Sequence, residues 1–213
     1  KPPRAKRRPK GTYLQQIDEE FCSDGWRYNA GDAANFVIGQ GDVLVTPLQL
    51  TMAYAALVNG GTLYRPQLAK GFLSADGRTA TVLPPVRSGR VPVPTAVLDY
   101  IKSALAGVVL PPGTAKGSFH GFPLSQVAVG GKTGTADVLN KAPTSWFASF
   151  APVAGSRYVT VVMVPEAGTG GTTAAPIARK IWDGIYGLEG TKAALSPAGV
   201  LPASLPVVLP DGS

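Results

Sequence analysis

The stretch Gly130-Gly131-Lys132-Thr133-Gly134-Thr135-Ala136 is the most informative part of this chain, because it ends a strand-like run before a second, aromatic strand at residues 146–150. Side chains alternate along a strand, so Thr133 and Thr135 point to one side and Lys132 to the other. The strand edge offers unpaired N–H and C=O groups to an extended peptide, and Gly134 lets a ligand backbone approach. The stretch therefore predicts a strand that binds a peptide along its edge.

The residue types of this strand suit a ligand that carries a carboxylate. Lys132 supplies a fixed positive charge, and the hydroxyl groups of Thr133 and Thr135 supply hydrogen bonds. The backbone N–H of Thr135 is a candidate donor to an oxyanion that forms during acyl transfer.

Two other interpretations of these letters remain open from the tetrapeptide alone. A phosphate-binding loop requires a glycine where this chain has Gln126, and a helix directly after Lys132. The residues that follow Lys132 are instead rich in turn formers as far as Pro143, which argues against such a loop. A plain glycine-rich strand end is the other alternative.

Residues 46–61 predict a helix with clear signals at both ends. Thr46 is the expected N-cap, Pro47 the first helical residue, and Gln49 the partner of Thr46 in a capping box, while Asn59-Gly60 ends the helix. Almost every residue between the caps is apolar, so we expect this helix to be buried on most sides.

Several motifs along the chain together resemble one known family. They are Gly-Gln-Gly at 39–41, Val-Thr-Pro-Leu-Gln-Leu at 45–50, Ala-Tyr-Ala-Ala-Leu-Val-Asn-Gly-Gly-Thr at 53–62, Tyr-Arg-Pro-Gln at 64–67, Gly-Lys-Thr-Gly-Thr-Ala at 131–136 and Trp-Phe-Ala-Ser-Phe-Ala-Pro at 146–152. Their order resembles the C-terminal part of the transpeptidase domain of class B penicillin-binding proteins, most closely the elongation type, penicillin-binding protein 2. The resemblance covers about residues 12–187.

The resemblance implies an α/β (α+β) fold in which helices flank an antiparallel β-sheet, the fold that penicillin-binding protein transpeptidases share with serine β-lactamases, here present in part. It also implies a peptidoglycan D,D-transpeptidase that cross-links stem peptides through a serine acyl-enzyme and is acylated by β-lactams. Lys132, Thr133 and Gly134 would then belong to the catalytic motif, and Lys132, Thr133 and Thr135 would bind the substrate. Thr135 would contribute its N–H to the oxyanion hole, and neither cofactor nor metal is expected.

The chain departs from the family in one important respect. The family's active site combines Ser-x-x-Lys, Ser-x-Asn and Lys-Thr-Gly, and only the third occurs here: no serine has a lysine three residues on, and none begins Ser-x-Asn. Both missing motifs lie upstream in the family. We therefore expect this chain to be the back half of a transpeptidase domain, inactive alone and dependent on the N-terminal half.

The net charge of +7 is concentrated at one end of the chain. Six basic residues lie within residues 1–11, where prolines at 2, 3 and 9 oppose a helix, so this run predicts a solvated linker. Binding to anionic lipids or wall polymers is a second interpretation. Nucleic acid is not an expected partner, because nothing downstream supplies base contacts.

Neither a signal peptide nor an apolar span of about 18 residues appears. The resemblance nevertheless implies a parent anchored to the outer face of the bacterial cytoplasmic membrane through an N-terminal segment absent from this sequence, with a membrane glycosyltransferase as partner. We expect Cys22 to be a structural or surface residue. Residues 188–213 are rich in proline and alanine and predict a poorly ordered tail.

The remaining patterns predict two helices and a third strand. Leu98, Ile101, Leu105 and Val108 recur at helical spacing after Pro94. Residues 158–164 predict a buried strand, which would complete an antiparallel meander. Residues 168–173 resemble a dinucleotide loop but end in Thr173, so a connector is favoured. In the helix expected at 174–186, which Gly187 ends, Ala174, Ile177, Ile181 and Ile185 form the predicted packing stripe.

Two other functions stay open from the sequence. A serine β-lactamase or β-lactam sensor shares the Lys-Thr-Gly strand and would be distinguished by how fast it releases a penicilloyl adduct. A non-catalytic, transpeptidase-like module that binds the cell wall is the second alternative.

Overall fold

The computed structural model describes residues 19, 22, 27–41, 43–75, 78–138 and 140–188. The chain forms two units, one up to Leu44 and one from Val45 onward. The predicted linker at 1–11 and all of the predicted tail except Leu188 lie outside the described residues. Within the described part, no helix is both long enough and apolar enough to cross a membrane.

The first unit contains the helix α2, Ala30–Val37. Asn29 caps it, because its Oδ1 accepts from the N–H of Gly31 at 2.7 Å, and Asp32 Oδ2 accepts from the N–H of Asn29 at 2.8 Å. Cys22 is exposed. The helix buries none of its residues.

The second unit is built on the predicted antiparallel meander, which the structure confirms. Its strands are β5 (Gly130–Ala136), β6 (Thr144–Ala151) and β7 (Tyr158–Val164), in the order β5-β6-β7. Lys132 is paired with Ala148 and Gly134 with Trp146. Because β5 is at the end of this order, one of its edges carries no partner strand within the described residues.

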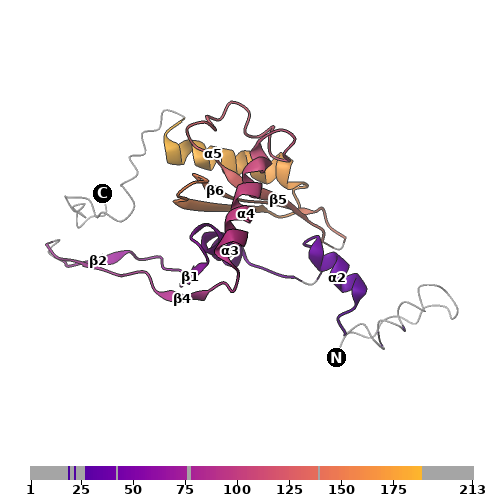
Figure 1. Cartoon of the computed structure of the whole chain (residues 1–213), viewed down its shortest axis with the longest axis horizontal. Coiled ribbons are helices and arrows are strands. Elements are labelled where there is room, and N and C mark those ends of the chain that lie inside the picture. Colours follow the sequence, from indigo (N-terminus) through magenta and orange to yellow (C-terminus); the bar gives the residue numbers. More distant parts are fainter. Residues whose placement is uncertain are drawn as a thin grey trace. The chain divides into compact units, whose positions relative to one another are not determined.

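The helix α5, Ala175–Tyr186, covers one face of the sheet, and Figure 1 shows it on the opposite side from α3. Trp182 is fully buried there, and its Nε1 donates to Ser149 Oγ at 3.1 Å. Gly187, with φ 68°, ends the helix as predicted. The helix begins as a π-helical turn, η2, Gly170–Ala174.

The predicted packing stripe of α5 was partly wrong. Ile177 and Ile181 are 41% and 39% exposed, whereas Ala174, Ala175, Ala178 and Trp182 are fully buried. Small alanines let the helix lie close to β6, and this closeness brings Trp182 onto Ser149, where the indole N–H finds its acceptor. Helical spacing alone does not distinguish these two adjacent stripes.

The helix α3, Pro47–Val58, packs on the other face of the sheet. Its capping box is formed as predicted, since Thr46 Oγ1 accepts from the N–H of Gln49 and Gln49 Oε1 accepts from the N–H of Thr46. The Tyr54 ring lies 6.5 Å from the Phe150 ring. The expectation that the helix is buried on most sides was wrong: only Ala56 is buried, and Leu48 is 55% exposed. The described residues cover α3 on one side, which leaves its other apolar side chains open.

The helix predicted after Pro94 is confirmed as α4, Thr95–Leu105, which continues into a 3-10 turn, η1, Ala106–Val109. Ile101, part of its predicted apolar spacing, is 38% exposed. Leu98 and Val108 are buried, while Lys102 pairs with Asp99 at 3.0 Å on the outer side. Pro111 and Pro112 follow in a turn that ends the helical segment.

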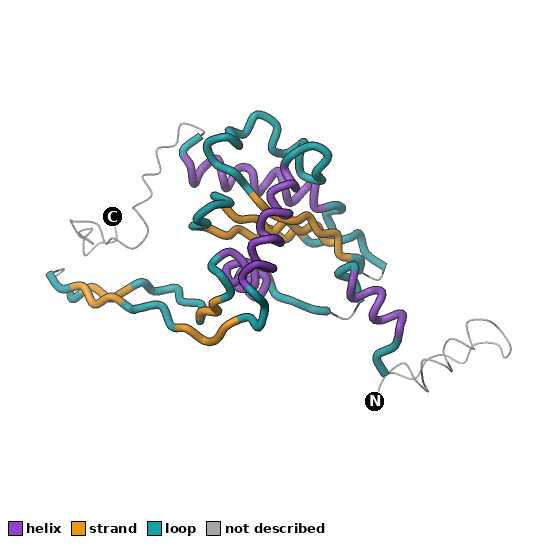
Figure 2. Tube along the Cα trace, viewed as in Figure 1, coloured by secondary structure: helices purple, strands orange, loops and turns teal. Residues whose placement is uncertain are grey.

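An extended two-stranded ribbon between α3 and α4 was not predicted. The strand β1 (Thr62–Tyr64) pairs with β4 (Arg87–Arg90), and β2 (Gly71–Leu73) pairs with β3 (Ala80–Val82). Figure 2 shows these strands along one narrow arm. We call residues 62–90 the ribbon.

Replacing Trp182 with Phe should lower the free energy of unfolding by about 2–3 kcal/mol, because the smaller ring leaves a cavity and loses the hydrogen bond to Ser149. Urea unfolding of both proteins measures this difference. The matched control is Tyr100→Phe at a residue that is 75% exposed, where we expect no measurable change. An equal cost at both positions would contradict the proposed packing.

Burial raises the pKa of Tyr54 from 10.0 to about 12. The folded protein therefore holds the phenol proton more tightly than the unfolded chain, so this contribution to stability is complete below about pH 10 and is lost as the pH approaches 12. Tyr54→Phe should change the temperature of the thermal transition little at pH 7. Between roughly pH 9.5 and 11.5, the transition temperature of the variant should fall less steeply than that of the unchanged protein. Identical alkaline profiles for the two proteins would refute this assignment.

Candidate functional site

A groove of about 800 Å³ runs beside the predicted ligand-binding strand β5. Thr133 and Thr135 line it, as the alternation of the strand predicts, while Lys132 is on the other face. Two segments far apart in the sequence supply the facing walls. The lining residues outside β5 are Gly113, Thr114, Lys116, Gly117, Ser118, Thr169, Gly170, Gly171, Thr172 and Pro176.

Lys132 is exposed on the face of the sheet that α3 covers. Its Nζ donates to the carbonyl oxygen of Thr133 at 2.8 Å, which turns the ammonium back along its own strand. The structure thus brings Lys132, Thr133, Gly134 and Thr135 together on one strand and presents the charge and the hydroxyl groups on opposite sides of it. An extended ligand at the free edge would lie between the two.

Thr114 is a residue of the groove that sequence reasoning missed. Its hydroxyl lies 2.7 Å from the hydroxyl of Thr133, and this hydrogen bond fixes the orientation of the Thr133 side chain. The sequence presented Thr114 only as part of a turn after Pro111-Pro112. Gly113 allows that turn to close, because a Cβ there would clash with the carbonyl oxygens of Gly107 and Val108.

The wall that carries Thr114 is tied to the core at its far end. The buried Phe119 ring lies 6.0 Å from the Phe147 ring, and Phe122 is also buried. Arg179 holds the same segment from α5, since its Nη1 donates to the carbonyl oxygen of His120 at 3.1 Å and its guanidinium lies over the Phe122 ring. The groove is therefore bounded by an anchored turn.

The second wall packs directly on β5. A Cβ at Gly170 would lie 2.6 Å from the oxygen and 2.8 Å from the nitrogen of Gly134, and would also clash with the carbonyl oxygen of Trp146. Ser145, which is fully buried, donates to the carbonyl oxygen of Thr169 at 2.9 Å and accepts from the N–H of Ala174 at 3.1 Å. The loop that resembled a dinucleotide motif is thus the start of α5, held against β5.

The structure also bears on the phosphate-loop interpretation and on the charge of the surface. Lys132 lies inside β5, which continues to Ala136, instead of standing at the start of a helix.

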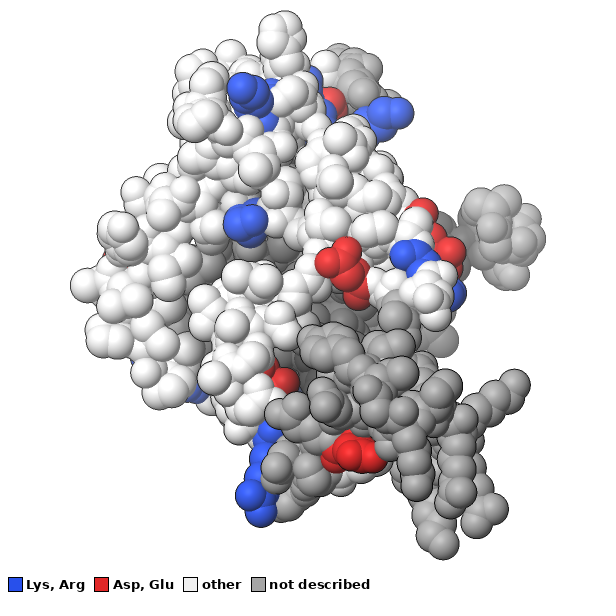
Figure 3. Space-filling view, turned by 90° about the vertical axis from the view of Figure 1, so that its right-hand side faces the viewer, with Lys and Arg blue, Asp and Glu red and all other residues white. Residues whose placement is uncertain are grey.

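On the face shown in Figure 3, the described Lys and Arg side chains stand apart from one another and form no continuous basic patch. The described residues contain no group of three or more His, Cys, Asp or Glu arranged to hold a metal ion.

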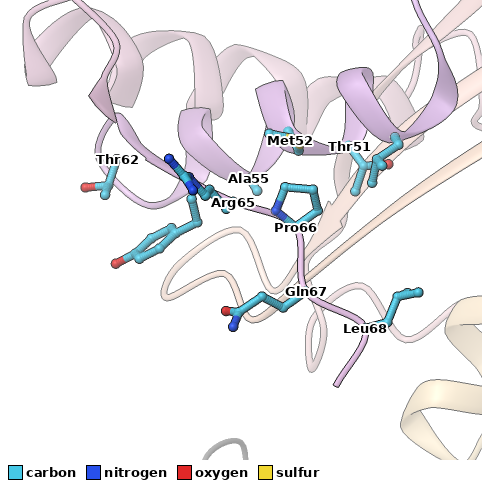
Figure 4. Close-up of a pocket in the computed structure, with 10 residues that line it drawn as sticks. Thr51, Met52, Ala55, Thr62, Arg65, Pro66, Gln67 and Leu68 are labelled. Atoms are coloured by element: carbon cyan, nitrogen blue, oxygen red, sulfur yellow. The ribbon is translucent and has the colours of Figure 1, made fainter. Parts of the chain in front are cut away.

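A second hollow, of about 530 Å³, lies between α3 and the root of the ribbon. Figure 4 shows Thr51, Met52 and Ala55 of α3 on one side and the segment from Arg65 to Leu68 on the other. Its walls are mostly apolar, and Arg65 is the one charged lining residue in this described segment. None of the residues predicted for the site lies in it.

The groove beside β5 is lined mainly by groups that form hydrogen bonds. Lys116 is the one charged side chain among its described lining residues, and the others offer hydroxyl groups and backbone. The hydroxyl of Ser118 donates to the carbonyl oxygen of Gly171 at 3.0 Å.

Comparison with known proteins matches residues 13–183 to the family model of the penicillin binding protein transpeptidase domain. The chain is 33% identical over 153 residues to the peptidoglycan D,D-transpeptidase PbpA of Mycolicibacterium smegmatis, which covers 67% of this chain and 29% of that protein. It is 30% identical over 172 residues to the peptidoglycan D,D-transpeptidase MrdA of Haemophilus influenzae, covering 72% of this chain and 25% of that protein. The chain therefore spans less than a third of the length of these relatives.

Solved structures resemble this one over most of the chain. Penicillin-binding protein A of M. tuberculosis, in an imipenem acyl-enzyme complex, gives a TM-score of 0.64 at 25% identity, covering 74% of this chain and 34% of that one. Penicillin-binding protein 2 of Pseudomonas aeruginosa, in complex with WCK 5153, gives 0.61 at 29% identity, covering 78% and 35%. These likenesses confirm the fold class predicted from the sequence.

Gly170→Ala should lower the free energy of unfolding by about 1–3 kcal/mol and weaken hydrogen-exchange protection at Gly134, because the added methyl group meets the β5 backbone. Urea unfolding and amide exchange measure the two effects. Gly117→Ala is the control from the same groove, since a Cβ there has no heavy atom within 4 Å. If the variant at 170 behaves like the one at 117, the close contact with Gly134 does not determine the position of the strand.

Proposed function

This chain belongs to the family of penicillin-binding protein transpeptidase domains, and we propose that it supplies the carboxylate-binding strand of a peptidoglycan D,D-transpeptidase. One observation carries the proposal: Lys132-Thr133-Gly134-Thr135 occupies β5, which is the end strand of the sheet within the described residues, beside a groove lined by hydroxyl groups. Residues 12–187 form the transpeptidase part in this proposal, preceded by the basic linker at 1–11 and followed by the tail at 188–213.

In the proposed reaction, a stem peptide lies along the edge of β5 and its terminal carboxylate is bound by Lys132, Thr133 and Thr135. A serine attacks the carbonyl of the penultimate D-Ala, the terminal D-Ala leaves with a proton, and an amine from a neighbouring stem peptide then releases the acyl group. The N–H of Thr135 donates to the oxyanion that forms in each step. Such a donor typically contributes about 3–4 kcal/mol to the transition state.

The nucleophile in this proposal comes from the N-terminal half of the same domain. That half would carry Ser-x-x-Lys and Ser-x-Asn, which this sequence lacks. Two features support the idea that it packs here: Leu48 of the apolar helix α3 is 55% exposed, and an apolar hollow borders the same helix. Apolar surface of this extent is unfavourable in contact with water and marks an interface.

The proposal extends to inhibitors, partners and location. β-Lactams would bind the same strand, because their carboxylate imitates that of the stem peptide, and the acyl-enzyme complex of the M. tuberculosis protein supports this. We also propose action outside the cytoplasmic membrane, anchored through an upstream segment, alongside a membrane glycosyltransferase of the elongation machinery. A penicillin-binding protein 2 of Helicobacter pylori forms a complex with MreC.

Lys132→Ala, made in the complete protein, should reduce the rate of labelling by fluorescent penicillin at least about 100-fold through the loss of its carboxylate partner. The thermal transition should change little, because the Lys132 side chain is exposed and its hydrogen bond is to a carbonyl oxygen of its own strand. Lys180→Ala, at an exposed lysine of α5, is the control and should label normally. Undiminished labelling of Lys132→Ala would remove this strand from the active site.

Intact-mass analysis after penicillin treatment tests where the nucleophile lies. We expect an adduct on the upstream segment, and only when both segments are present. An adduct on this chain would contradict the proposed division, and no adduct at all would favour a non-catalytic module. Rapid loss of the adduct would favour a β-lactamase, since a transpeptidase holds its penicilloyl group for a long time.

A further inference from the structure

The ribbon has almost no buried surface of its own. Every described residue from Tyr64 to Arg90 is exposed, except Leu83, which is half-buried. A two-stranded ribbon without a packed face has only marginal stability in water, because its hydrogen bonds alone do not offset the entropy of ordering it. The exposed surface of the ribbon therefore suits a binding role better than a structural one.

The ribbon is basic along its whole length. It carries five basic residues and a single acidic one, Asp76. The basic residues are Arg65, Lys70, Arg78, Arg87 and Arg90. Within the part of the chain that the structure describes, Arg65, Lys70, Arg87 and Arg90 make no ion pair. Since the chain outside residues 1–11 is close to neutral, the ribbon is a local concentration of positive charge.

Apolar and aromatic side chains stand among these charges. Phe72 is 62% exposed and Val82 is 51% exposed. Phe72 is paired with Thr81 across the two strands, and Lys70 directly precedes β2, two residues before Phe72. The surface thus combines an aromatic ring with cations, which suits a ligand that has both apolar faces and carboxylates.

We propose that the ribbon is a second binding surface for peptidoglycan, separate from the edge of β5, and that it holds the carboxylates of stem peptides on a glycan strand. This inference rests on the proposed function for the identity of the polymer. Charge complementarity supports it, because stem peptides end in carboxylates. So does the shape of the site: one arm of the ribbon extends about 40–45 Å at the usual rise per residue, long enough to contact repeating units of a polymer.

The binding should be multivalent and sensitive to salt. Each exposed lysine or arginine contributes little on its own, because water screens the pair. Several such contacts along one polymer raise the overall affinity, because the first contact increases the effective concentration for the others. Loss of one cation therefore weakens the overall binding of the polymer. Exposed pairs also weaken at high ionic strength, which gives the ribbon a signature that an apolar contact lacks.

The experiment measures co-sedimentation of the complete protein with purified sacculi, after penicillin treatment to occupy the β5 site. It compares about 50 and 300 mM salt, between which the screening length changes roughly twofold. Lys70→Glu and Arg87→Glu should each weaken binding at low salt about fivefold or more and flatten its salt dependence. Lys180→Glu makes the same change of charge on α5, off the ribbon, and should bind like the unchanged protein. Thermal transitions of all variants should agree.

Sacculi whose carboxyl groups have been amidated provide the second readout. The unchanged protein should bind these sacculi as weakly as the ribbon variants do, since the carboxylates are gone. Equal binding of all variants to untreated sacculi would overturn the proposal. Equal binding of the unchanged protein to amidated and untreated sacculi would also overturn it. Penicillin labelling is measured separately. No labelling of the unchanged protein would contradict the proposed function. Normal labelling, together with ribbon variants that bind sacculi as well as the unchanged protein does, would contradict only the role of the ribbon.

Discussion

The position of the strand β5 depends on a close contact between backbone segments. Gly170 lies against the backbone of Gly134 and Trp146, too close for a Cβ. The start of α5 is therefore fixed to the strand that carries Lys132, and Ser145 secures the same junction through hydrogen bonds to Thr169 and Ala174. Because packed interiors transmit small displacements, the groove and the core helix are positioned as one unit.

The two faces of the sheet have different roles. The face beneath α5 is closed by Trp182, Phe147 and Phe119, and the hydrogen bond from Trp182 to Ser149 satisfies the buried indole N–H. The face beneath α3 carries Lys132 and has an apolar helix that is only partly covered. The closely packed face beneath α5 thus supports β5, while the face that carries Lys132 is only partly covered by the described residues.

Family membership and geometry contribute different parts of the functional argument. The match to residues 13–183 establishes the kind of domain, and the likeness to solved penicillin-binding proteins establishes its fold. The geometry adds what a match cannot: Thr114 bonded to Thr133, a groove between two anchored walls, and a basic ribbon outside the sheet. These features are the basis of the two proposed binding surfaces, the edge of β5 and the ribbon.

The sequence by itself determined the features that depend on near neighbours. The capping box of Thr46 and Gln49, the meander of β5, β6 and β7, the end of α5 at Gly187 and the alternation of Lys132 with Thr133 all follow from local propensity and period. Only the tertiary structure decided which stripe of α5 is buried, how far α3 is covered, and that Thr114 reaches Thr133 from 19 residues away. The physical reason is that these depend on close approach between distant segments: small residues such as Ala178 and Gly170 permit it, and a sequence pattern does not reveal which surface they will meet.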